Sequence, residues 1–111
     1  MGILIIRRKS EMEYVVVRNN RALVTINGVF RASISVVLKA ELEQAFRQGC
    51  QKVVFDFQNT TFIDSPSLKV ILKTLDSVGA ENMDIINVRR NDKIHNSFKR
   101  YRIENYISSF V

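Results

Sequence analysis

A short segment near the middle of the chain combines groups that could take part in chemistry. It reads Phe62-Ile63-Asp64-Ser65-Pro66-Ser67-Leu68, so a β-prone stretch ends in an acid and a hydroxyl, and a helix begins at once. Backbone N–H groups at a helix N-terminus favour an anion. A phosphate on Ser65 or Ser67 would be held by these groups and would add roughly two negative charges to the surface. Alternatively, Ser65 is only an N-cap and Asp64 only an acid that matches the helix dipole.

The other residues of catalytic type are scattered along the chain. Cys50 follows a predicted helix end, His95 falls in another helix, and Asp56 lies in a strand, where we expect a structural hydrogen-bond acceptor. One cysteine and one histidine argue against a Cys–His dyad and against a metal site with several histidines. The four glycines are too scattered for a phosphate-binding loop. We therefore expect no enzymatic activity, no cofactor and no metal.

The composition is that of one globular domain. The 111 residues include 17 Lys+Arg and 11 Asp+Glu, and 46% are hydrophobic. We expect one domain over 1–111, with 1–13 as a lead-in segment. No apolar run approaches the roughly 18 residues of a membrane span, and the charges after the apolar start at 1–6 stand on the wrong side for a secretory signal. With a single cysteine, these features predict a cytoplasmic protein.

Hydrophobic periodicity predicts the elements that position the Asp64 segment. A hairpin is expected first, with strands at 14–17 and 22–26 around Asn19-Asn20. Helices are expected at 33–48, 65–79 and from Asn91 or Asp92 to 101, alternating with strands at 53–57 and 83–88. This order predicts an α/β fold: a mixed, mostly parallel sheet of four to five strands with an N-terminal hairpin and three helices. The loops at 27–33, 58–66 and 88–92 would follow strand ends, where functional groups usually lie.

Each predicted helix has one apolar face that should pack on the sheet. Glu41 falls off the face of the first helix, and Thr61-Phe62-Ile63 should re-enter the core. The tail at 103–110 should pack back onto the body. The inward residues are expected to be Ile34, Val37, Leu38, Leu42, Ala45 and Phe46 in the first helix, Leu68, Ile71, Leu72 and Leu75 in the second, and Ile94, Phe98 and Tyr101 in the third.

These pieces together resemble the STAS domain, the fold of anti-sigma factor antagonists and of the cytoplasmic part of sulphate transporters. The resemblance rests on Val53-Val54-Phe55-Asp56-Phe57, then Thr61-Phe62-Ile63-Asp64-Ser65, then the helix to Gly79, with Ile26-Asn27-Gly28-Val29-Phe30 upstream. It covers roughly residues 14–107. It implies a regulatory, non-enzymatic module that docks a partner kinase or anti-sigma factor.

Two departures from the family pattern bear on regulation. Pro66, which has no hydroxyl, stands at the position of the family's phosphoacceptor, and Ser67 replaces the glycine that follows. Arg31 stands where the family has an acid. If the chain is phosphorylated here, the acceptor would therefore be Ser65 or Ser67. Ser65 matches the family motif, and Ser67, inside the first helical turn, could carry a phosphate close to the helix N-terminus.

Three functions remain open at this stage. The first is a switching antagonist whose partner interface comprises Phe30, Arg31, Asp64, Ser65, Ser67 and Lys69. The second is a constitutive scaffold or transporter accessory subunit, which the loss of the acceptor hydroxyl favours. The third is a basic protein that binds nucleic acid or anionic lipid, and nucleic acid is the less favoured of these partners. Its binding residues would be Arg89, Arg90, Lys93, Lys99, Arg100 and Arg102.

Overall fold

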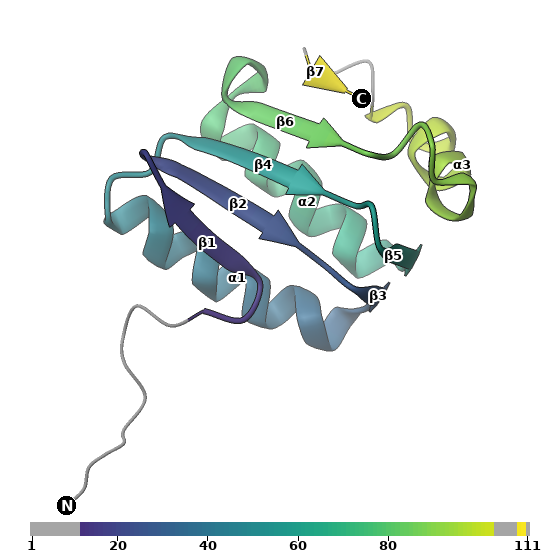
Figure 1. Ribbon diagram of the computed structural model, residues 1–111, viewed down its shortest axis with the longest axis horizontal. Coiled ribbons are helices and arrows are strands. Elements are labelled where there is room, and N and C mark those ends of the chain that lie inside the picture. Colours follow the sequence, from purple (N-terminus) through teal and green to yellow (C-terminus); the bar gives the residue numbers. More distant parts are fainter. Residues whose placement is uncertain (1–11, 104–108, 111) are drawn as a thin grey trace, which may run out of the picture.

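The computed structural model describes residues 12–103 and 109–110 as an α/β domain built on two sheets. The main sheet has the order β1-β2-β4-β6-β7, in which β1 is antiparallel to β2 and the remaining pairs are parallel (Figure 1). A small parallel pair, β3-β5, forms the second sheet. The strands are β1 (Val15–Arg18), β2 (Arg21–Thr25), β3 (Gly28–Phe30), β4 (Lys52–Asp56), β5 (Thr60–Ile63), β6 (Met83–Ile86) and β7 (Ser109–Phe110).

The helices lie on one side of the main sheet and at its end. In the described part of the chain they are α1 (Ala32–Arg47), α2 (Ser65–Val78) and α3 (Asp92–Arg100), with a short 3₁₀ turn, η1 (Ala80–Asn82). Both α1 and α2 run behind the sheet in Figure 1, and α3 lies beside β5.

The expected fold class is confirmed. Within the described residues three strands are additional: β3 and β5 occupy parts of the regions expected to be loops, at 27–33 and 58–66, and β7 lies in the expected tail. The lead-in before residue 12 and tail residues 104–108 fall outside the described residues.

The hairpin turn explains the strand order at one edge. Asn19 and Asn20 have φ values of 52° and 64°, in the left-handed region that asparagine tolerates, as a two-residue hairpin turn requires. The turn places Arg18 opposite Arg21 in the ladder. Since alternate side chains point to opposite faces, Val15, Ala22 and Val24 all face the helices and are buried.

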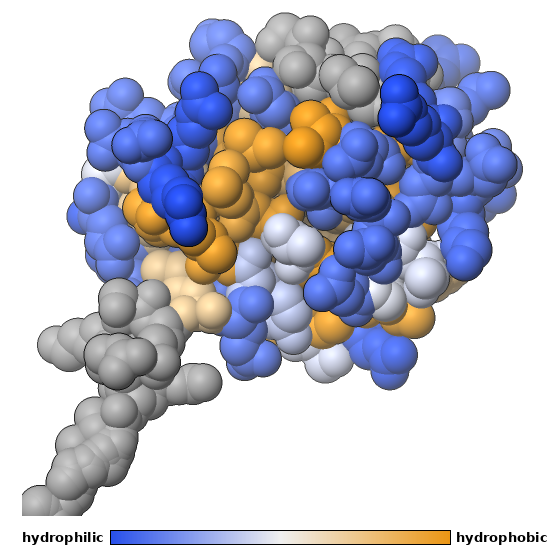
Figure 2. All heavy atoms as spheres, viewed as in Figure 1, coloured by the Kyte–Doolittle hydropathy of each residue, from blue (hydrophilic) through white to orange (hydrophobic). Residues whose placement is uncertain are grey.

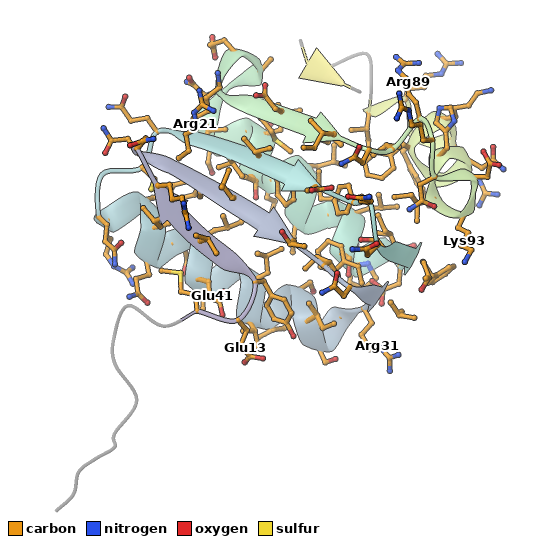
Figure 3. All side chains as sticks on the ribbon, viewed as in Figure 1. Glu13, Arg21, Arg31, Glu41, Arg89 and Lys93 are labelled. Carbon is orange, nitrogen blue, oxygen red and sulfur yellow. The ribbon has the colours of Figure 1, made fainter. Side chains whose placement is uncertain are left out.

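Glu41 corrects the expected inward face of α1. It is buried rather than solvated, and its carboxylate points toward the start of β1 (Figure 3). The N–H groups of Glu13, Tyr14 and Val15 donate to it over 2.8, 2.9 and 3.2 Å. An acid at this position satisfies backbone donors of the incoming chain, and helical periodicity cannot reveal such a role.

Three further expectations about buried faces need correction. In α2, Thr74 is buried while Leu72 and Leu75 are only partly buried against the core. Tyr101 follows α3 and is 47% exposed, because the helix ends before it could join the face of Ile94 and Phe98. Phe62 is 53% exposed, since its neighbour Ile63 takes the inward position on β5.

Phe57 joins the parts of the core. Its ring lies 6.3 Å from that of Phe30, 5.7 Å from that of Phe55 and 5.5 Å from that of Phe98. These rings come from β3, β4 and α3, and all are fully buried. One aromatic cluster therefore connects the main sheet, the small sheet and the third helix. No helix among the described residues is long and apolar enough to cross a membrane.

Candidate functional site

Asp64 connects the N-termini of two helices. One carboxylate oxygen, Oδ1, accepts from the N–H of Ser67 in α2 (3.0 Å), and the other, Oδ2, accepts from the N–H of Ala32 in α1 (2.9 Å). The N–H of Asp64 itself donates to the carbonyl of Phe30 (3.1 Å), at the end of β3. Since β3 and β5 are adjacent and parallel, both helices begin at the same edge, where one side chain can reach both.

The carboxylate stays ionised at lower pH than an ordinary aspartate. Partial desolvation is the largest influence on the pKa of Asp64 and acts to raise it, but hydrogen bonding from Ser67 and Ala32 and the positive charge of Arg31 outweigh it and lower the pKa. Two helix N-termini that carry partial positive charge favour the same outcome. Asp64 is therefore a fixed negative charge at neutral pH.

Exposed groups surround this fixed carboxylate. Arg31 is the N-cap residue of α1, and Ser65 opens α2 with Lys69 one turn further along. Phe62, two residues before Asp64 in β5, has an exposed ring. We name Arg31, Phe62, Asp64, Ser65 and Lys69 the Asp64-turn surface. It combines an exposed aromatic ring, charges of both signs and an exposed hydroxyl.

The structure corrects three of the site expectations. The N-cap of α2 is Asp64, not Ser65, because a carboxylate three residues before Ser67 reaches its N–H, and Ser65 is an exposed first helical residue. Ser67 is fully buried, so it presents no hydroxyl for a kinase or a partner. Phe30 is also fully buried in the aromatic cluster and presents no side chain to a partner.

Sequence reasoning missed Phe62 as a site residue and missed that Asp64 also caps α1. Arg31, the N-cap residue of α1, makes no side-chain capping bond, so the Asp64 carboxylate supplies that acceptor from another part of the chain. Thr61 and Phe62 are both exposed between buried Thr60 and Ile63, so simple alternation along β5 could not have signalled an outward Phe62. No local pattern could have signalled the bond to Ala32, because 32 residues separate the partners.

The remaining residues of catalytic type have structural roles. Asp56 Oδ1 accepts from the N–H of Gln58 (3.0 Å) and from the side-chain amide of Asn87 (2.8 Å), as expected of a structural acceptor. Cys50 is buried, and desolvation raises the pKa of its thiol. Over residues 12–103 and 109–110, no three His, Cys, Asp or Glu side chains gather as a metal site would require.

A polar hollow of about 610 Å³ lies between the loop before β5 and the start of α3. Asn91 lines this hollow, and its side-chain amide donates to the carbonyls of Phe57 (2.9 Å) and Thr60 (2.7 Å). Arg90 and Lys93 also line it. The six cations of the basic alternative are exposed along this end of the molecule (Figure 3 labels two). They are Arg89, Arg90, Lys93, Lys99, Arg100 and Arg102.

Comparison with known proteins identifies the fold family. A family model described as the STAS domain matches residues 11–110. A solved Thermotoga maritima protein, described as a candidate anti-sigma factor antagonist, superposes with a TM-score of 0.72 at 16% identity, covering 87% of this chain and 84% of that one. The unphosphorylated anti-sigma factor antagonist SpoIIAA superposes with a TM-score of 0.72 at 14% identity, covering 89% and 87%. Phosphorylated SpoIIAA from Bacillus gives 0.65, covering 89% and 90%. No curated protein sequence matches the chain.

Proposed function

The chain belongs to the STAS domain family, and we propose that it is a non-enzymatic regulatory module that binds a protein partner through the Asp64-turn surface. The partner class is an anti-sigma factor with serine-kinase activity, the class that anti-sigma factor antagonists oppose. The observation that carries the proposal is the exposed ring of Phe62 two residues before a carboxylate that is hydrogen-bonded to two helix starts.

Phe62 supports binding because its exposure has no structural benefit. A side chain of this size that is 53% exposed leaves apolar surface in water. Aromatic anchors surrounded by polar groups are frequent hot spots of protein interfaces. The exposed Arg31 and Lys69 of the same surface supply positive charges that can orient an acidic partner segment.

Ser65 is the acceptor if the module is switched by phosphorylation. It is exposed at the first position of α2, and Lys69 stands four residues later, on the same helix face. A phosphate on Ser65 would add roughly two negative charges next to the Asp64 carboxylate. Pairing with Lys69 would offset part of the repulsion and would remove that cation from a partner.

The test is binding to a serine-kinase anti-sigma factor encoded beside the gene, measured by calorimetry. We expect Phe62→Ala and Lys69→Glu to weaken binding about tenfold or more. Lys99→Glu, which reverses an exposed charge on α3, serves as the matched control. Wild-type affinity for both variants would move the interface elsewhere. Mass spectrometry after incubation with ATP should place phosphate on Ser65 and not on Ser67.

Pro66 favours a second function, a constitutive scaffold or transporter accessory subunit. It removes the hydroxyl from the position where the family's acceptor is expected. In that case the partner binds through the same surface, no phosphate is incorporated, and Ser65→Ala behaves as wild type. Binding to duplex DNA or anionic vesicles that falls steeply with salt, and is lost with Arg90→Glu and Lys93→Glu together, would support the basic alternative instead.

A further inference from the structure

The main sheet has a second face, opposite α1 and α2, that no helix of the described residues covers (Figure 1). Alternation and strand register place four apolar side chains there: Val16, Leu23, Val54 and Ile86. Val16 is 52% exposed and the other three are partly exposed. Figure 2 shows apolar surface running across this side of the molecule between strongly hydrophilic groups. We call this uncovered side of the main sheet, with these four apolar side chains, the open face.

A row of cations borders the open face at one end. Arg18 pairs with Arg21 across the hairpin, and Arg21 pairs with Lys52, so three neighbouring strands each place a cation in one row. Directly opposed like charges destabilise a sheet. Arg18 and Arg21 are exposed and Lys52 is partly exposed, so all three cations can reach a bound ligand. An anionic group over this row would offset the repulsion between the opposed cations.

The apolar open face and the cation row together suit one kind of ligand. We propose that the open face binds an amphipathic helix of a protein partner, with its apolar side on Val16, Leu23 and Val54 and acidic residues over the cation row. Parallel sheets are as a rule covered on both faces, usually by helices. Two described acids lie on the same face: Asp84 shares the row of Val54, and Asp56 shares the row of Ile86. Both would repel acidic residues of the helix, so its acidic end would point toward the hairpin.

The shape of the open face favours a packed helix over a lipid surface. Leu23, Val54 and Ile86 are already partly buried on the sheet and offer less apolar surface than an exposed membrane anchor would. A second copy of this chain would bring another row of the same cations and another net charge of +6. An acidic helix meets neither objection.

This surface is separate from the Asp64-turn surface. Arg21 and Arg31 lie at opposite ends of the molecule in Figure 3. The cation row stands at the amino ends of β2 and β4, whereas Asp64 follows the carboxyl end of β5. Failure of one binding proposal therefore leaves the other intact.

The experiment uses the full chain, labelled with ¹⁵N, and a synthetic helical peptide of about 14 residues with leucines on one face and glutamates in its first turn. We expect the peptide to shift the amide signals of Val16, Leu23 and Val54. Arg21→Glu should weaken its affinity about fivefold or more, and a peptide with lysines in place of the glutamates should not bind. Val16→Asp should also weaken binding.

Two matched controls guard against general effects. Val36→Asp alters an exposed valine on α1, and Lys99→Glu reverses an exposed charge on α3; both should bind the peptide as wild type does. Four outcomes would overturn the proposal: amide shifts that avoid the open face, affinity unchanged by Arg21→Glu and Val16→Asp, contacts from residues 1–11 to Leu23 in the free protein, or concentration-dependent shifts of this face without peptide. Binding of phosphatidylglycerol vesicles in place of the peptide would assign the face to a membrane.

Discussion

At the scale of single residues, the Asp64 carboxylate caps both α1 and α2. Substituting Asp64 and Ser65 separately shows which of the two residues provides this capping. Asp64→Ala removes the acceptor for the N–H groups of Ser67 and Ala32. We expect a loss of about 1–2 kcal/mol in the free energy of unfolding, measured by urea denaturation. Ser65→Ala is the control: it removes an exposed hydroxyl that caps nothing and should change stability by less than about 0.5 kcal/mol. Equal losses for the two variants would restore Ser65 as the cap.

The same carboxylate makes stability depend on pH in a defined direction. Because the pKa of Asp64 is lower in the folded chain than in the unfolded one, the unfolded state binds more protons in acid. The contribution is complete above the ordinary aspartate pKa of about 3.9 and is lost as pH falls through the lower folded value. We expect the stability difference between wild type and Asp64→Asn to shrink below about pH 4. A difference that grows toward pH 3 would contradict the direction of the shift.

At the scale of elements, Glu41 ties α1 to the beginning of β1. Glu41→Ala leaves the N–H groups of Glu13, Tyr14 and Val15 without their acceptor. Because N–H groups left without an acceptor destabilise the folded state, we expect the free energy of unfolding to fall by about 2–3 kcal/mol. Hydrogen exchange at the amides of Tyr14 and Val15 should also become faster. Glu43→Ala, an exposed acid on the same helix, should stay within about 0.5 kcal/mol of wild type. Unchanged exchange at Tyr14 would show that the bond does not hold the strand.

Comparison of Glu41 with the apolar residues of the helices shows which features sequence reasoning can predict. Periodicity locates α1 and α2 and the buried Leu38, Leu68 and Ile71, because burial of apolar side chains repeats along a helix. It fails for Glu41, since a buried acid looks like a solvated one until its distant partners are known. It also fails for β3, whose pairing with β5 spans separate parts of the chain. At the site, residue types placed Asp64 and Ser65 at a helix start, but which one caps depends on side-chain geometry.

At the scale of the whole molecule, Phe57 connects both sheets and α3 through three ring contacts. Since no described part of the core is separate from this cluster, we expect one cooperative unfolding transition, with amides of β3, β4 and α3 lost together. Phe57→Ala should lower the free energy of unfolding by about 3–5 kcal/mol through the cavity it leaves.

If the substitution prevents folding, Phe57→Leu keeps most of the volume and should still destabilise measurably while preserving the single transition. Phe62→Ala is the matched control, because its ring is 53% exposed; we expect it to cost less than about 1 kcal/mol. The measurement is residue-resolved NMR through a urea titration, in which β3 and α3 report on opposite sides of the cluster. Separate midpoints for β3 and α3 in Phe57→Leu, or equal losses for Phe57→Ala and Phe62→Ala, would show that Phe57 does not couple the parts of the domain.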